Sequence, residues 1–218
     1  MPQKPPAENA SRKAIELLAE EYPNAKYYLN FSTPTDLVVA AIISAQTRDE
    51  VVNSVTPELF KKFKTAKDYA NADVNQLVAY IKKVSFSGNK AKNIIAACKI
   101  LQEKYKGRIP DNIEELMDLP GIGKKTANTI LINAYGIVNG IPVDTWVIKL
   151  SNRIGLSINK DPDKIEQDLM KVVDKKYWGK FAYILKSHGK KICQSQVPIC
   201  SKCLLSKLCP RNGVTKSA

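Results

Sequence analysis

The 218-residue sequence predicts an all-α fold. Apolar residues recur at helical spacing in several segments, and residues that start or end helices flank those segments. No alternation of period two is long enough to build a sheet. The chain is long enough to bury a substantial core, and its hydrophobic content of 44% argues against wholesale disorder.

The first strong element covers residues 36–45. This apolar run fits a buried strand or a buried helix, but its alanines and the preceding Thr33 and Pro34 favour a helix, since proline suits a first helical turn. Residues 90–106 follow with apolar positions near helical spacing, and Gly107 supplies a C-cap. Further along, residues 162–174 and 177–187 have the pattern of amphipathic helices.

Residues 112–135 predict two short helices joined by a turn that contains Gly121 and Gly123. The second helix has apolar residues at positions i, i+3, i+4 and i+7, namely Ala127, Ile130, Leu131 and Ala134. The two glycines let the backbone N–H groups of the turn approach an anion at the start of that helix, where the helix dipole also favours negative charge. In a basic protein, this turn, which includes Ile122 and Lys124, predicts a site that binds nucleic-acid phosphates and does not recognise the base sequence.

Two polar residues near this turn are candidates for chemistry. Lys125 lies in the first turn of the second helix, where the dipole disfavours the charged amine and so favours a nucleophile. On the residues alone, a second phosphate-contacting lysine beside Lys124 is the favoured interpretation. Asp144 directly precedes another apolar segment that is predicted to begin a helix, so it is an N-cap candidate. A capping role would hold its carboxylate ionised and oriented.

The charge of the chain predicts an anionic partner. Lysine and arginine number 34 against 21 acidic residues, a net charge of +13. The last 44 residues hold ten basic residues and no acidic one. A solvated surface that only aids solubility normally mixes signs, so this asymmetry favours nucleic acid.

Four of the five cysteines lie close together near the C-terminus: Cys193, Cys200, Cys203 and Cys209. Disulfides are a poor interpretation without an export signal, whereas four thiolates suit Zn²⁺ or a [4Fe-4S] cluster. A zinc ribbon usually pairs two Cys-x2-Cys steps, and this chain has one, which favours the cluster. Cys98 fits a buried small hydrophobe, and His188 fits a structural role near the cysteines.

No run of residues approaches the roughly 20 apolar residues that span a bilayer, and residues 1–6 lack the apolar core of a secretory signal. We therefore expect a cytoplasmic protein without a membrane partner.

These features together resemble the helix-hairpin-helix DNA glycosylases that also act as abasic-site lyases. The resemblance rests on Leu119–Asn128, Val143–Thr145 and the four-cysteine tail, with Ser44–Asp49 as a weaker match, and it spans residues from about 30 to 210. It implies two helical domains with a DNA cleft between them. Residues 31–145 would form a six-helix barrel that includes the hairpin, and residues 1–30 with 146–218 would carry a [4Fe-4S] cluster.

The resemblance also implies a function. Such a protein is a base excision repair enzyme that flips a damaged base out of double-stranded DNA. It would remove oxidised pyrimidines and cleave the abasic site by β-elimination through a Lys125 Schiff base, with Asp144 assisting. It would act as a monomer in a prokaryotic cytoplasm, associated with the nucleoid through DNA.

Other positions carry over from the family with less support from the residues themselves. Gln46 would fill the gap left by the flipped base, and Lys190 and Lys191 would contact phosphates. Phe86 would be a wedge beside the opposite base, or else a loop anchor packed on the core. The family's usual histidine after Val-Asp-Thr is Trp146 here, which could pack in the interdomain groove or meet DNA and bears on lesion preference.

Two alternatives remain: a mismatch-specific DNA glycosylase, and a non-catalytic iron–sulfur protein that binds damaged DNA. Lys125 argues against the monofunctional glycosylases, and the presence of both Lys125 and Asp144 argues against pure binding.

Overall fold

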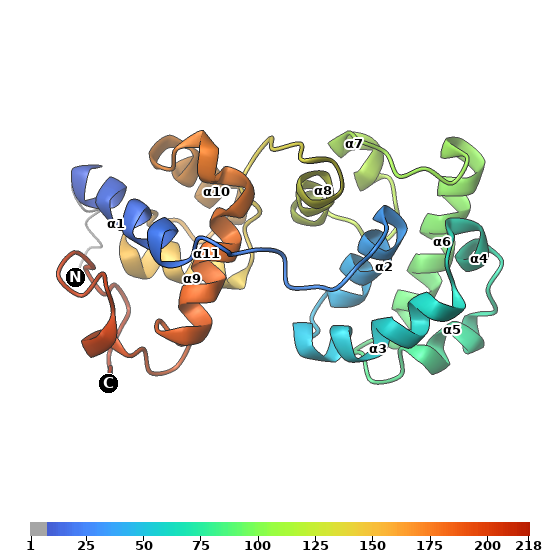
Figure 1. Cartoon of the computed structure of the whole chain (residues 1–218), viewed down its shortest axis with the longest axis horizontal. Helices are drawn as coiled ribbons and strands as arrows, with labels where there is room; N and C mark the ends of the chain where they lie inside the picture. The colour runs from blue at the N-terminus through green and yellow to red at the C-terminus, as the bar shows by residue number, and fades with distance from the viewer. Residues whose placement is uncertain (1–7) are drawn as a thin grey trace. The chain divides into compact units, whose positions relative to one another are not determined.

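The computed structural model describes residues 8–218, and every regular element among them is helical, so the all-α prediction is confirmed for this part of the chain (Figure 1). The chain divides into two compact units. One is Tyr28–Ile137, and the other joins the N-terminal segment up to Tyr27 with Val138–Ala218.

The Tyr28–Ile137 unit is organised around its longest helix, α6, drawn in green in Figure 1, which contacts α2, α4 and α5. Its helices are, in chain order, α2 (Pro34–Ser44), α3 (Asp49–Lys62), α4 (Ala66–Ala70), α5 (Val74–Tyr80), α6 (Ser87–Tyr105), α7 (Ile113–Met117) and α8 (Lys124–Ile130). A π-helical turn, Leu131–Tyr135, continues α8. Ile94, Ala97, Cys98 and Leu101 on α6 are fully buried, which confirms the apolar face and the buried Cys98.

Helix α2 is the predicted helix of residues 36–45. Thr33 is its N-cap and Pro34 its first residue, as the sequence indicates. The Thr33 hydroxyl accepts a hydrogen bond from the Asp36 amide at 3.1 Å, and Asp36 Oδ2 accepts from the Thr33 amide at 3.0 Å. Because Leu37 to Ile43 are all buried, this helix has no solvent-facing stripe, which is why periodicity alone could not separate helix from strand.

Helix α6 begins and ends on residues with left-handed backbone. Its N-cap is Phe86, with φ 55°, and its C-cap is Lys106, with φ 53°. The sequence predicted Gly107 as the C-cap. In the structure, both Lys106 and Gly107 have left-handed backbones, and the Gly107 amide donates to the Leu101 carbonyl at 2.9 Å. The helix therefore ends one residue earlier than predicted.

The second unit packs α11 against α1 and α9, and α10 against α1 and α9. Its helices are α1 (Glu8–Glu21), α9 (Thr145–Ile154), α10 (Pro162–Val172) and α11 (Trp178–Lys191), with short 3₁₀ turns at Lys175–Tyr177 and Cys200–Lys202. The predicted helices of residues 162–174 and 177–187 correspond to α10 and α11.

The borders of the two units differ from the domain borders predicted after residues 30 and 145. They fall after Tyr27 and Ile137, so residues 138–145 belong with the cysteine-bearing unit. A local reason is that Asp144 is hydrogen-bonded to the first turn of α9, which ties the segment before it to that helix.

No helix in residues 8–218 has the length and hydropathy needed to cross a bilayer.

The cap of α2 provides a direct test of this fold. Replacing Thr33 by alanine removes the acceptor of the Asp36 amide, and we expect it to lower the free energy of unfolding by about 1 kcal/mol. Urea unfolding measures the change. Ser54→Ala, at an exposed hydroxyl within α3, is the control and should stay within about 0.5 kcal/mol of the parent protein. Equal losses in the two variants would contradict the role given to the cap.

Candidate functional site

The predicted hairpin is formed by α7, a turn and α8. Asn112 caps α7, since its Oδ1 accepts from the Glu115 amide at 2.9 Å. In the turn, Gly121 has φ 87°, a left-handed conformation that glycine adopts without strain. A Cβ at Gly121 would also lie 3.1 Å from Asn93 Nδ2 and 3.3 Å from Ile42 Cγ2, so α6 and α2 both press on the turn.

The residues of this turn divide into anchors and exposed groups. Ile122 was predicted to contact DNA, but its side chain is 6% exposed and its amide donates to the Leu119 carbonyl, so it anchors the turn in the core. Gly123 is exposed and is the N-cap of α8. The apolar stripe of the second helix is confirmed at Ala127, Ile130 and Leu131, but Ala134 is only half-buried, because the π-helical turn rotates it off the stripe.

Lys124 and Lys125 form the first turn of α8, and both side chains are exposed. The Lys125 carbonyl accepts a hydrogen bond from the Thr129 hydroxyl at 2.9 Å, which fixes the main chain that carries this lysine. The structure thus presents two neighbouring amines at the start of one helix. Which of them reacts stays a prediction.

Asp144 is the N-cap of α9, as the sequence indicates. Its Oδ1 accepts from the Trp146 and Val147 amides, both at 2.9 Å. These two bonds orient the half-buried carboxylate and use Oδ1 alone. Lys125 and Asp144 belong to different units, so their joint action stays a prediction as well.

Trp146 packs against α11 inside its own unit. A Cβ at Gly189 would lie 2.3 Å from Trp146 Cε3, so the indole lies directly on the backbone of α11 where only glycine fits. Lys149 Nζ lies 5.8 Å from the centre of the same indole. These contacts lie within the unit that carries Trp146, so a place in the interdomain groove or against DNA stays a prediction.

Gln46 and Phe86 both have left-handed backbones outside glycine, with φ 51° and 55°. Both side chains are exposed, and that of Phe86 is 64% exposed. Phe86 therefore does not pack on the core, and the loop-anchor interpretation is wrong. An exposed phenyl ring on a residue with this uncommon backbone suits a wedge, the role suggested by the resemblance.

Lys90 is a residue that the sequence analysis missed. It is 6% exposed, and its ammonium donates to Ile43, Ala45 and Thr47. A signal was present, because Lys90 shares the apolar face of α6 with Ile94, one turn further on.

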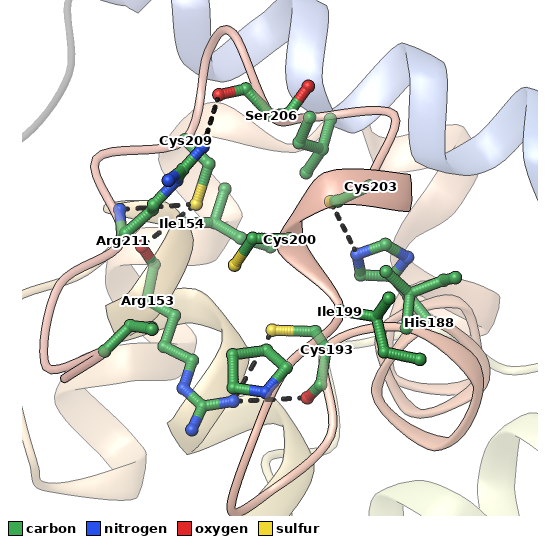
Figure 2. A pocket seen from close by; sticks show the side chains of 14 residues that line it. Arg153, Ile154, His188, Cys193, Ile199, Cys200, Cys203, Ser206, Cys209 and Arg211 are labelled. Atoms are coloured by element: carbon green, nitrogen blue, oxygen red, sulfur yellow. Dashed lines mark hydrogen bonds between the residues drawn. The ribbon is translucent and has the colours of Figure 1, made fainter. Parts of the chain in front are cut away.

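The four C-terminal cysteines line one pocket (Figure 2). Figure 2 shows their sulfur atoms around a common space, together with Arg153 and His188. In residues 8–218, no group of three or more His, Cys, Asp or Glu side chains has the close arrangement that would hold a metal ion directly. If one zinc ion bound all four sulfurs in a tetrahedron with Zn–S bonds of about 2.3 Å, the sulfurs would lie about 3.8 Å from one another.

N–H groups are directed at the cysteine sulfurs from several sides. Arg153 Nη1 lies 3.6 Å from Cys193 Sγ, and the Arg211 amide donates to Cys209 Sγ at 3.4 Å. Burial raises the pKa of the Cys193, Cys203 and Cys209 thiols. Burial disfavours the charged thiolate form, so a positive charge close to these sulfurs stabilises it.

Arg153 and His188 fix the loop that carries the cysteines. Arg153 also donates to the carbonyls of Gln194 at 2.7 Å and Ser195 at 2.8 Å. His188 is 1% exposed, lies 3.1 Å from the Tyr22 hydroxyl through Nδ1, and lies 3.5 Å from Cys203 Sγ through Nε2. Burial lowers the pKa of His188 to about 4, so it is neutral at physiological pH. The predicted structural role of His188 agrees with these contacts.

Lys190 and Lys191 end α11, next to the cysteine loop, and both are exposed. Lys191 Nζ lies 5.5 Å from the centre of the Tyr22 ring. Their assigned phosphate contacts stay a prediction.

Comparisons with known proteins agree on one family. Residues 39–175 match the model of the HhH-GPD superfamily of base excision DNA repair proteins. The chain is 43% identical to endonuclease III of Synechocystis sp. over 194 residues, which cover 89% of each protein.

Solved structures give the same result. A trapped covalent intermediate of endonuclease III with DNA is 35% identical, with a TM-score of 0.89 over 94% of this chain and 96% of that one. A non-covalent complex of endonuclease III with DNA is also 35% identical and has a TM-score of 0.90 over the same shares.

The two hairpin glycines make a matched pair for a test. Gly121→Ala places a Cβ against Asn93 and Ile42 at positive φ, so we expect it to lower the free energy of unfolding by about 1–3 kcal/mol. Gly123→Ala meets no atom within 4 Å and has φ −101°, so its loss should stay below about 1 kcal/mol. Denaturant unfolding of both variants measures the difference. A larger loss for Gly123→Ala would show that the turn is built differently.

Proposed function

Because the chain belongs to the HhH-GPD superfamily of base excision DNA repair proteins and, within it, to the endonuclease III family, we propose that it is a bifunctional DNA glycosylase and abasic-site lyase. Its substrate is double-stranded DNA that contains an oxidised pyrimidine or an abasic site. The single observation that carries the proposal is the hairpin, which presents the exposed Lys125 at the start of α8 beside an exposed glycine turn.

The hairpin binds the sugar-phosphate backbone in this account. Gly123 and the first residues of α8 lie where a helix begins, and N–H groups at such a position attract phosphate oxygens. Lys124 adds a positive charge to the same place. Since phosphate contacts carry no sequence information, the enzyme can act wherever a damaged base occurs.

Lys125 is proposed as the nucleophile. Its neutral amine attacks C1′ of the deoxyribose, the bond from C1′ to the base breaks, and the base leaves with the electron pair and takes up a proton. The sugar ring then opens to a Schiff base. Loss of the C2′ proton expels the 3′ phosphate, so the strand breaks on the 3′ side of the lesion by β-elimination.

Asp144 assists this sequence as an anion. Positive character develops at C1′ as the base departs, and a fixed carboxylate stabilises it without reorganisation at the moment of reaction. The carboxylate also accepts the proton that the attacking amine loses. The two amide bonds to Oδ1 support this role, because they orient the group and leave the carboxylate's other oxygen outside the cap.

The four cysteines are proposed to hold a [4Fe-4S] cluster, a group that takes four thiolate ligands. Bound there, the cluster would tie the 193–209 loop together through iron–sulfur bonds. The cysteine set fits it, because the sulfurs surround a common cavity and receive N–H groups from Arg153 and Arg211. The same loop would place Lys190 and Lys191 against phosphates.

Borohydride trapping on duplex DNA with a thymine glycol tests the reaction. The parent protein should form a covalent adduct, and Lys125→Gln should form none. Lys124→Gln, its exposed neighbour, is the matched control and should still be trapped although it binds DNA more weakly. Base release without any adduct would instead mean a monofunctional glycosylase, and tight binding without release would mean a non-catalytic damage-binding protein.

Asp144→Asn keeps a carbonyl oxygen that can cap α9 but removes the charge. We expect it to fold and to lower the single-turnover rate of base release by about 10²–10⁴-fold. An unchanged rate in a folded variant would remove Asp144 from the mechanism.

Iron content tests the metal centre. Cys200→Ser should lose iron and the broad visible absorbance of an iron–sulfur protein, whereas Cys98→Ala, at the buried cysteine of the other unit, should keep both. A colourless parent protein that carries zinc would contradict the cluster.

The salt dependence of binding tests the two lysines after α11. Neutralising Lys190 and Lys191 together should reduce the slope of log affinity against log salt by about two units. Lys171→Gln, at an exposed lysine paired with Asp168, is the control and should leave the slope unchanged. A double variant with the parent slope would place both lysines away from the duplex.

A further inference from the structure

The side chain of Lys90 is a buried cation whose hydrogen-bonding capacity is fully used. Its Nζ donates to the carbonyls of Ile43 at 2.7 Å and Ala45 at 2.5 Å, and to the Thr47 hydroxyl at 2.8 Å. An ammonium group has three N–H donors, so each has a partner. Because a buried charge without such partners would raise the free energy of the folded state, the three hydrogen bonds hold the ammonium and its acceptors together.

All three acceptors belong to the end of α2 and the turn that follows it. A cation at a helix C-terminus is favoured by the dipole of that helix. Gln46 lies between the second and third acceptors and has a left-handed backbone with φ 51°. The turn that exposes Gln46 is therefore closed around the Lys90 ammonium.

The main chain of the same residue fixes a second turn. The Lys90 amide donates to the Phe86 carbonyl at 3.1 Å, in the first turn of α6. Phe86 is the left-handed N-cap of that helix, and its ring is exposed. Left-handed residues other than glycine cost of order 1–3 kcal/mol and persist only where their surroundings hold them.

We propose that Lys90 is a positioning residue that sets the spacing between Gln46 and Phe86, so that the two side chains enter the damaged duplex together. The inference rests on the proposed function, in which Gln46 fills the gap left by the extruded base and Phe86 wedges beside the opposite base. A side chain that fills the gap and one that wedges beside the opposite base must act at the same base-pair step. Displacements of about 1 Å in such placements can lower the reaction rate strongly.

Lys90 does not itself serve as an attacking amine. Burial lowers its pKa to about 8, which on chemical grounds alone would suit a nucleophile. However, its side chain is 6% exposed and its three donors are bound within the protein, so a sugar carbon has no approach to Nζ. The exposed Lys125 keeps that role.

The test compares three single variants of the complete protein. Lys90→Met removes the donors and keeps the length of the side chain. Thr47→Val removes one acceptor with little change of shape, and it keeps the test informative if Lys90→Met folds poorly. Leu101→Ala, at a fully buried position near the other end of α6, is the control for loss of stability.

Two readouts separate positioning from general weakening. The first is single-turnover base release from a thymine glycol duplex, with 2-aminopurine beside the lesion to report unstacking by fluorescence. The second is cleavage of a preformed abasic site in single-stranded DNA, where no base has to be extruded.

For Lys90→Met we expect a loss of base release of about tenfold or more and a smaller 2-aminopurine signal, with single-strand cleavage within about threefold of the parent. Thr47→Val should show a smaller loss of the same kind, and Leu101→Ala should show neither.

The proposal is overturned if Lys90→Met and Thr47→Val keep the parent rate and fluorescence, or if Leu101→Ala reproduces their losses. Failure of the proposed function itself looks different, because the parent protein would then neither release the base nor cleave the abasic site.

Discussion

A buried positive charge must find an acceptor for each of its hydrogens, and in the Tyr28–Ile137 unit Lys90 meets that constraint with three oxygens from one short segment. The consequence is mechanical. The end of α2, the turn after it and the start of α6 cannot move independently, because they share one ammonium. Ile94, one turn further along α6 than Lys90, is fully buried, so the helix that carries Lys90 is packed into the core of this unit. The hairpin turn packs at Gly121 against the same two helices, on the side chains of Asn93 and Ile42.

In the other unit, α9 connects chemistry to the cysteine loop. Asp144 caps its first turn, and Arg153 in its last turn holds the main chain from Cys193 to Ser195. The ten residues of α9 span about 15 Å, at about 1.5 Å per residue. A stable cysteine loop therefore fixes one end of the helix whose other end orients the carboxylate. A metal bound by the cysteine loop, as proposed, would support the Asp144 carboxylate through this helix.

The sequence was informative where a residue type has a local cause. Thr33 and Asp144 accept hydrogen bonds from amides within three residues, and Pro34 starts a helix through its own fixed φ. Their roles could therefore be predicted from the neighbouring residues alone. Lys90 could not be predicted in this way, because its acceptors lie more than 40 residues earlier and lysine is usually exposed. Likewise, the site of Trp146 depends on Gly189, whose missing side chain makes room on another helix. Contacts made by distant residues decide these cases. Periodicity places Lys90 on the apolar face of α6, but it does not indicate which groups accept the hydrogen bonds of its ammonium.

The central claim is that one particular amine, that of Lys125, forms the covalent bond to the sugar. Peptide mapping of the borohydride-reduced adduct by mass spectrometry tests it most directly, since the reduced sugar remains on the residue that attacked. We expect the added mass on Lys125 and on no other lysine. Modification of Lys124 or Lys90 instead, or of the chain's N-terminal amine, would contradict it.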